Sequence, residues 1–224
     1  MPFFDKRPDI ARDAEQTLHR ADREVREVYG PPGQLTTSIV NGAHDVWSEL
    51  ADVFQYPTDG SPSEPQMYLL FELIYFFAHM TLRLAVASQY SKRQIGTLQA
   101  FMGPLLASTV VDTFFAHWPE EWKKGLRGNF FDKLNDAEQE YATCRKLVSE
   151  QDPLSPDTLF GRVARNSCAL WERDQDIDAL TAVLSVATRA FAGMHLEAQV
   201  AEVKAVIDRV DPKRLASFWK SQGA

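Results

Sequence analysis

The chain has 224 residues, of which 45% are apolar and 11% aromatic, so it can bury a substantial core and belongs to neither the disordered nor the fibrous class. Acidic side chains outnumber basic ones by 31 to 24, which gives a net charge of −7 at pH 7. Because this charge opposes attraction to phosphate backbones and anionic lipids, we expect neither a nucleic acid nor a membrane as partner.

The first predicted element is an amphipathic helix over residues 10–28. Its apolar side chains recur at steps of three or four residues, at Ile10, Ala14, Leu18, Ala21, Val25 and Val28. Charged side chains fill the other faces, and the Gly-Pro-Pro-Gly motif at 30–33 is expected to end the helix. The narrow apolar seam can pack on the rest of the chain or on a second copy, so Leu18 and Val25 are candidate interface residues.

Helical periodicity continues along the rest of the chain. We expect further helices over residues 37–55, 64–90, 91–117, 119–149, 155–171, 180–191 and 196–210. The sequence contains no long alternating pattern of the kind that predicts a strand, and no internal repeat. These observations predict an all-α, single-domain bundle of about seven helices.

Two capping boxes place the starts of the two most apolar helices. In each box a serine is followed three residues later by a glutamine, at Ser63 and Gln66 and again at Ser91 and Gln94. The two side chains of a box bond backbone N–H groups that the first turn of a helix leaves free. We therefore expect a helical hairpin over residues 64–117 at the centre of the bundle.

The segments before and after the hairpin complete the domain organisation of the chain. We divide the chain into an amphipathic helix and linker at 1–33, a bundle core at 34–211 and an aromatic tail at 212–224. The tail places Phe218 and Trp219 on one side of a short helix. These two residues are further candidates for an interface with a partner chain, since tryptophan often anchors such contacts.

Two features predict a cytoplasmic protein. Residues 1–10 lack the apolar stretch of a secretory signal. The two cysteines, Cys144 and Cys168, are too few for a disulfide framework and lack the spacing of a zinc or redox site. We interpret them as buried thiols in a reducing compartment.

The first helix of the hairpin carries ionisable side chains within its apolar sequence. At 100° per residue, Glu72, His79 and Arg83 fall on one face. Charged residues at the centre of a membrane span cost about 2.5–3.5 kcal/mol each, so we expect this helix to be surrounded by protein. Each of its ionisable groups must then find a partner or lose its charge. We call these three residues the polar ladder.

Three explanations of the polar ladder remain open. The first is a buried hydrogen-bonded network, with Arg162, Arg165 or Asp112 as candidate partners. The second is a metal site between Glu72 and Asp112, which an antiparallel hairpin would bring to one level. The third is a pocket in which the ladder orients an organic ligand.

The metal explanation has one resemblance in its support. The Glu72-x6-His79 spacing is similar to that of helical di-metal oxidases with the heme-oxygenase-like fold, and this similarity implies a pair of metal ions held between helices. The second cluster of ligands that such proteins use is missing here, because Asp112 and His117 are not spaced to share one helix face. We predict no cofactor, with a metal ion as the alternative.

The sequence carries no catalytic motif: it has no phosphate-binding loop and no Gly-x-Gly-x-x-Gly fingerprint. We therefore expect a non-enzymatic interaction or scaffold protein that binds a protein partner or associates with itself. The alternative is a helical bundle that binds a small ligand or a metal ion between helices, a class that includes enzymes. The candidate ligand-binding residues are Glu72, His79, Arg83 and Asp112.

Overall fold

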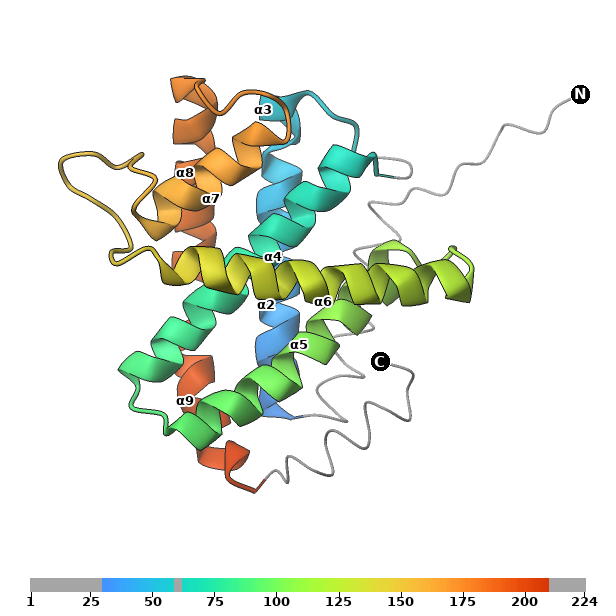
Figure 1. Ribbon diagram of the computed structural model, residues 1–224, viewed down its shortest axis with the longest axis vertical. Helices are drawn as coiled ribbons and strands as arrows, with labels where there is room; N and C mark the ends of the chain where they lie inside the picture. The colour runs from blue at the N-terminus through green and yellow to red at the C-terminus, as the bar shows by residue number, and fades with distance from the viewer. Residues whose placement is uncertain (1–29, 59–61, 210–224) are drawn as a thin grey trace, which may run out of the picture.

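The computed structural model describes residues 30–58 and 62–209 (Figure 1). Within these ranges it contains eight helices and no strand, which confirms the all-α prediction. The helices are α2 (Pro31–Glu49), α3 (Ala51–Phe54), α4 (Glu64–Ala87), α5 (Lys92–Phe114), α6 (Glu120–Ala142), α7 (Leu159–Ala169), α8 (Ile177–Gly193) and α9 (Leu196–Ile207). The expected interface residues Leu18, Val25, Phe218 and Trp219 lie outside the described residues.

The start of α2 corrects the sequence prediction. The Gly-Pro-Pro-Gly motif does not only separate two elements: Gly30 is the N-cap of α2, with φ at +59°, and Pro31 opens the helix. Proline suits the first turn because the N–H that it lacks would have no partner there. The helix therefore begins six residues earlier than residue 37, where apolar periodicity alone had placed it.

Both capping boxes are confirmed. The Ser63 N–H donates to Gln66 Oε1 over 2.6 Å, and α4 begins at the next residue. At the start of α5, Ser91 Oγ accepts from the Gln94 N–H at 3.2 Å while the Ser91 N–H donates to Gln94 Oε1 at 2.8 Å. Local side-chain chemistry thus fixes where the two central helices begin.

A single substitution tests the contribution of the second box. We expect Ser91→Ala to lower the free energy of unfolding by about 1 kcal/mol, because the Gln94 N–H loses its acceptor. Ser88→Ala, at the C-cap of α4, is the control and should change stability much less. Urea denaturation followed by circular dichroism measures both, and equal losses would show that the box adds nothing.

The helix α4 lies at the centre of the molecule. Helix α6 crosses in front of α4 and α5, and α2 runs behind them (Figure 1), consistent with the packing of α4 against α2, α5, α6, α7 and α9. Large aromatic side chains fill the space between α4, α6 and α7. Phe71 packs edge-on against Phe130 with ring centroids 5.2 Å apart, and Phe76 packs against Phe160 at 5.0 Å.

Among the described helices, α4 is the only single helix that is long and apolar enough to cross a membrane. Helices α8 and α9 reach that length and hydrophobicity only when they are taken together as one bent pair. In α4, 78% of the most apolar window is buried within the molecule. A buried core helix has the same length and composition as a membrane span. The burial of α4 therefore accounts for its hydrophobicity without reference to lipid.

Candidate functional site

The three residues of the polar ladder all face the C-terminal half of α6 and the segment that follows it. Glu72 accepts from the Tyr141 hydroxyl at 2.5 Å. One turn earlier on α6, Glu138 Oε2 lies 3.0 Å from His79 Nδ1. Arg83 donates to two backbone oxygens just beyond the end of α6, those of residues 144 and 145, at 2.7 and 3.3 Å. Each ladder residue therefore has its own partner, and no ladder residue bonds another.

Glu72 belongs to a network that joins three helices. Besides Tyr141, it accepts from Asn166 Nδ2 on α7 at 2.7 Å. The same amide nitrogen lies 3.2 Å from Oε1 of Glu140, which also accepts from Arg162 Nη1 at 3.1 Å. Arg162, one of the expected partners of the ladder, thus pairs with the neighbouring carboxylate and not with Glu72 itself.

Burial controls the protonation of this network. Loss of solvent raises the pKa of Glu72 above its usual value, and the nearby Glu140 charge adds to the rise, although the hydrogen bonds from Tyr141 and Asn166 oppose it. Burial and the Glu72 carboxylate also raise the pKa of Tyr141 well above 10.0. Because donors from α6 and α7 both bond Oε1 of Glu72, the network has the properties of a structural tie between α4, α6 and α7.

Two other expected partners lie elsewhere. Arg165 donates to the backbone oxygens of Leu154 and Asp174, each at 3.3 Å, and so holds the ends of α7. Asp112 was expected to point inward beside Glu72, and this is wrong. Its side chain is half exposed and bonds Arg127 at 2.6 Å.

The arrangement of α4 and α5 explains the position of Asp112. Helix α5 packs more extensively against α2 and α6 than against α4, so a residue of α5 at the level of Glu72 need not face α4. The face of α5 that carries Asp112 meets the start of α6, where Lys123 and Arg127 lie. Within residues 30–58 and 62–209 no three acidic, histidine or cysteine side chains are placed to hold a metal ion.

The pair formed by His79 and Glu138 differs from the Glu72 network because it is incompletely bonded. The His79 side chain is only 7% exposed. His79 Nε2 and Glu138 Oε1 are both buried and have no hydrogen-bond partner in the described structure. A buried polar atom without a partner costs about 1–3 kcal/mol, so this pair stabilises the fold less than a fully bonded pair would.

A cavity of about 240 Å³ adjoins Glu138. It lies between α4, α5 and α6 and is lined by Ala78, Leu82, Gln99, Met102, Gly103, Phe131, Leu134, Asn135 and Glu138. Ala78, Leu82 and Met102 form a buried apolar side, whereas Gln99 and Asn135 are exposed at the rim. We call this the α4–α6 cavity.

Glycine shapes one wall of the α4–α6 cavity. A Cβ atom added to Gly103 would lie 3.2 Å from Cε1 of Phe131, a contact tighter than side chains normally make. The missing side chain lets the Phe131 ring of α6 lie directly against the α5 backbone. Helices α5 and α6 therefore come close together at Gly103, and the cavity lies next to this contact.

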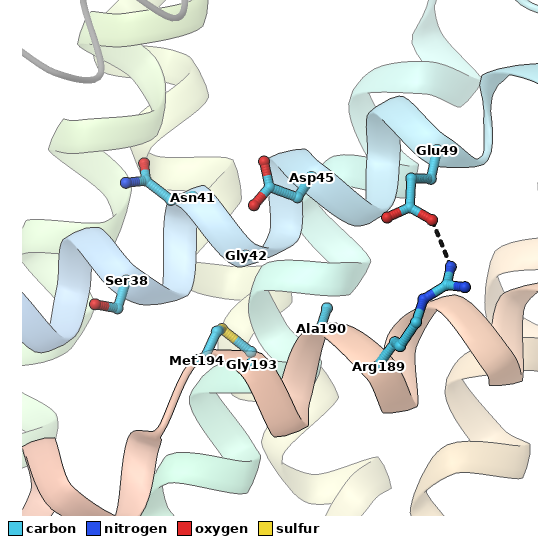
Figure 2. Close-up of a pocket in the computed structure, with 9 residues that line it drawn as sticks. All are labelled: Ser38, Asn41, Gly42, Asp45, Glu49, Arg189, Ala190, Gly193 and Met194. Atoms are coloured by element: carbon cyan, nitrogen blue, oxygen red, sulfur yellow. Dashed lines mark hydrogen bonds and ion pairs between the residues drawn. The ribbon is translucent and has the colours of Figure 1, made fainter.

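A second cavity, of about 490 Å³, lies between α2 and α8 (Figure 2). Figure 2 shows Asn41, Asp45 and Glu49 in a row along α2, with Arg189 of α8 bonded to Glu49. The Arg189 side chain is 65% exposed and that of Glu49 is 53% exposed. This space, the α2–α8 groove, is more open to solvent than the α4–α6 cavity and encloses a ligand less.

His79 could be identified from the sequence, whereas Glu138, Phe131 and the cavity itself were missed. The signal that was available is the spacing of Phe131, Leu134 and Glu138 on one side of the helix over residues 119–149. That spacing could not reveal which helix it faces.

Comparison of the chain with protein-family models, with curated proteins and with solved structures finds no match.

Proposed function

We propose that the protein binds a small organic molecule in the α4–α6 cavity. The observation that carries the proposal is the partly enclosed space with a buried apolar side, bordered by the side chain of Glu138. Ligand sites are typically apolar concavities with a few polar groups that orient the ligand. At about 240 Å³ the cavity suits a molecule the size of one aromatic ring with a short side chain.

This proposal revises the ligand-binding alternative drawn from the sequence. Of its four candidate residues, Glu72 and Arg83 are bonded within the protein and Asp112 faces outward. Only His79 remains close to a cavity, through its bond to Glu138. The proposed site therefore takes its charged group from α6 instead of α4.

The methionine methyl groups provide a direct test. The chain has 5 methionines, of which Met102 lines the α4–α6 cavity and Met194 lines the α2–α8 groove. We expect 2-phenylethanol, added to protein labelled with ¹³C at the methionine methyls, to shift the Met102 resonance progressively. The Met80 and Met194 resonances should not move.

A matched pair of variants controls this titration. Leu134→Phe enlarges a side chain of the cavity wall and should abolish the Met102 shift. Leu147→Phe makes the same change on an exposed loop residue and should leave it intact. An unmoved Met102 resonance in the unmodified protein, with both 2-phenylethanol and its amine analogue, would overturn the proposal.

A further inference from the structure

We propose that the ligand of the α4–α6 cavity is an organic cation, a primary ammonium on a short apolar body, with Glu138 as its counter-ion. This inference rests on the proposed function and adds the chemical class of the ligand. Three observations support it: the charge of the cavity wall, the unmet hydrogen bond of Glu138, and the distribution of polar and apolar groups around the space.

The charge of the wall favours a cation. Among the described residues that line the α4–α6 cavity, Glu138 is the one ionisable side chain, and none is a lysine or an arginine. An anionic ligand would meet the Glu138 carboxylate without a compensating positive charge. A cation would instead form an ion pair in partly desolvated surroundings, where charge-assisted hydrogen bonds are stronger than neutral ones.

The hydrogen bonding of Glu138 favours a ligand that donates. Its Oε2 is held by His79 Nδ1 at 3.0 Å, while Oε1 is buried without a partner in the described structure. A carboxylate oxygen can only accept, so the missing partner must be a donor. Oε1 has almost no accessible surface in this conformation, so an ammonium group, which has three N–H donors, would bond it after a rotation of the Glu138 side chain. Its other N–H groups can bond the side-chain oxygens of Gln99 and Asn135 at the rim.

The other lining groups suit the rest of such a molecule. Leu82, Met102 and Leu134 offer aliphatic and thioether surface, and Phe131 offers an aromatic ring. These groups can cover a short alkyl chain or one ring, but they cannot bond a second polar group. A metal ion alone does not fit, because only His79 and Glu138 are paired here and no third ligand joins them among the described residues.

The test compares two ligands that differ in charge but little in shape. Titration at the Met102 methyl should give 2-phenylethylamine a dissociation constant at least tenfold lower than that of 2-phenylethanol at neutral pH, as a charge-assisted bond implies. In Glu138→Gln this preference should fall to about threefold or less. Asp136→Asn, which removes the same charge from an exposed site on α6, should retain the full preference.

The outcomes separate this inference from the proposed function. Equal affinity for the amine and the alcohol in the unmodified protein would overturn the cation and leave the cavity as a ligand site. If neither compound shifts Met102, both proposals fail. The ratio measured in the unmodified protein, together with weak or no binding of 3-phenylpropanoate, keeps the test decisive even if Glu138→Gln fails to fold.

Discussion

Replacing Gly161 by alanine is expected to lower the free energy of unfolding by about 3 kcal/mol or more. A Cβ atom at Gly161 would lie 2.0 Å from the backbone oxygen of Ser155 and 2.8 Å from Thr158 Oγ1. Because the nearest atom belongs to the backbone, a side-chain rotation cannot relieve the clash. The loop before α7 must move instead.

That movement would break the hydrogen bonds that cap the N-terminus of α7. Thr158 Oγ1 accepts from the Gly161 N–H at 3.2 Å as the N-cap of the helix, and its hydroxyl donates to Ser155 O at 2.8 Å. The loss of an N-cap alone costs about 1 kcal/mol. The backbone contact between residues 146 and 159 also depends on the position of this loop.

Urea denaturation of the variant, with Gly128→Ala as control, checks the expectation. Gly128 lies inside α6, and a Cβ atom added there would meet open space, so alanine should add about 0.5–1 kcal/mol of stability through helix propensity. Opposite signs for the two substitutions are expected. A loss below about 1 kcal/mol at Gly161 would mean that the loop accommodates the methyl group.

The contrast between these glycines shows the limit of what a local sequence can encode. Both lie in segments that were predicted to be helical, and helical periodicity does not reveal that Gly161 meets a backbone atom of the preceding loop. The difference arises because Gly161 meets the loop at Ser155, whereas Gly128 faces open space. Capping signals such as Ser91 with Gln94 could be predicted because all their atoms lie within one turn of helix.

The candidate site follows the same division. Helical periodicity correctly placed Glu72, His79 and Arg83 on one face, because that property depends on α4 alone. The partners of this face depend on the angle at which α6 crosses α4 (Figure 1), and no local pattern encodes that angle. Glu138 therefore escaped notice, and Asp112 was placed inward on the assumption of a parallel-sided hairpin.

Glu72 gives the second prediction with a large effect. We expect Glu72→Ala to lower the free energy of unfolding by about 2–3 kcal/mol at pH 4, because the buried Tyr141 hydroxyl loses its acceptor and the Asn166 amide keeps only its longer bond to Glu140. Glu72→Gln retains an oxygen at the same position and can accept both bonds. The stability of this variant relative to the unmodified protein should depend on pH.

The sign of that dependence follows from the raised pKa of Glu72. The folded protein holds a proton on this carboxyl more tightly than the unfolded chain does. The stability that Glu72 contributes is therefore fully present below the unfolded pKa, near 4.5, and is lost as the pH rises through the higher folded pKa. A tenfold difference in proton affinity between the folded and unfolded states corresponds to about 1.4 kcal/mol.

Relative to the unmodified protein, Glu72→Gln should therefore gain stability between pH 4 and pH 8, measured by urea denaturation at each pH. Tyr141→Phe provides the matched comparison: it removes a hydrogen bond that favours the charged carboxylate, so the loss of stability with rising pH should become larger. In the double variant that combines Tyr141→Phe with Glu72→Gln, this additional loss of stability with rising pH should disappear. A difference between Glu72→Gln and the unmodified protein that stays constant from pH 4 to pH 8 would show that the network keeps Glu72 ionised at no cost, and the structural tie between α4, α6 and α7 would then be a charged one.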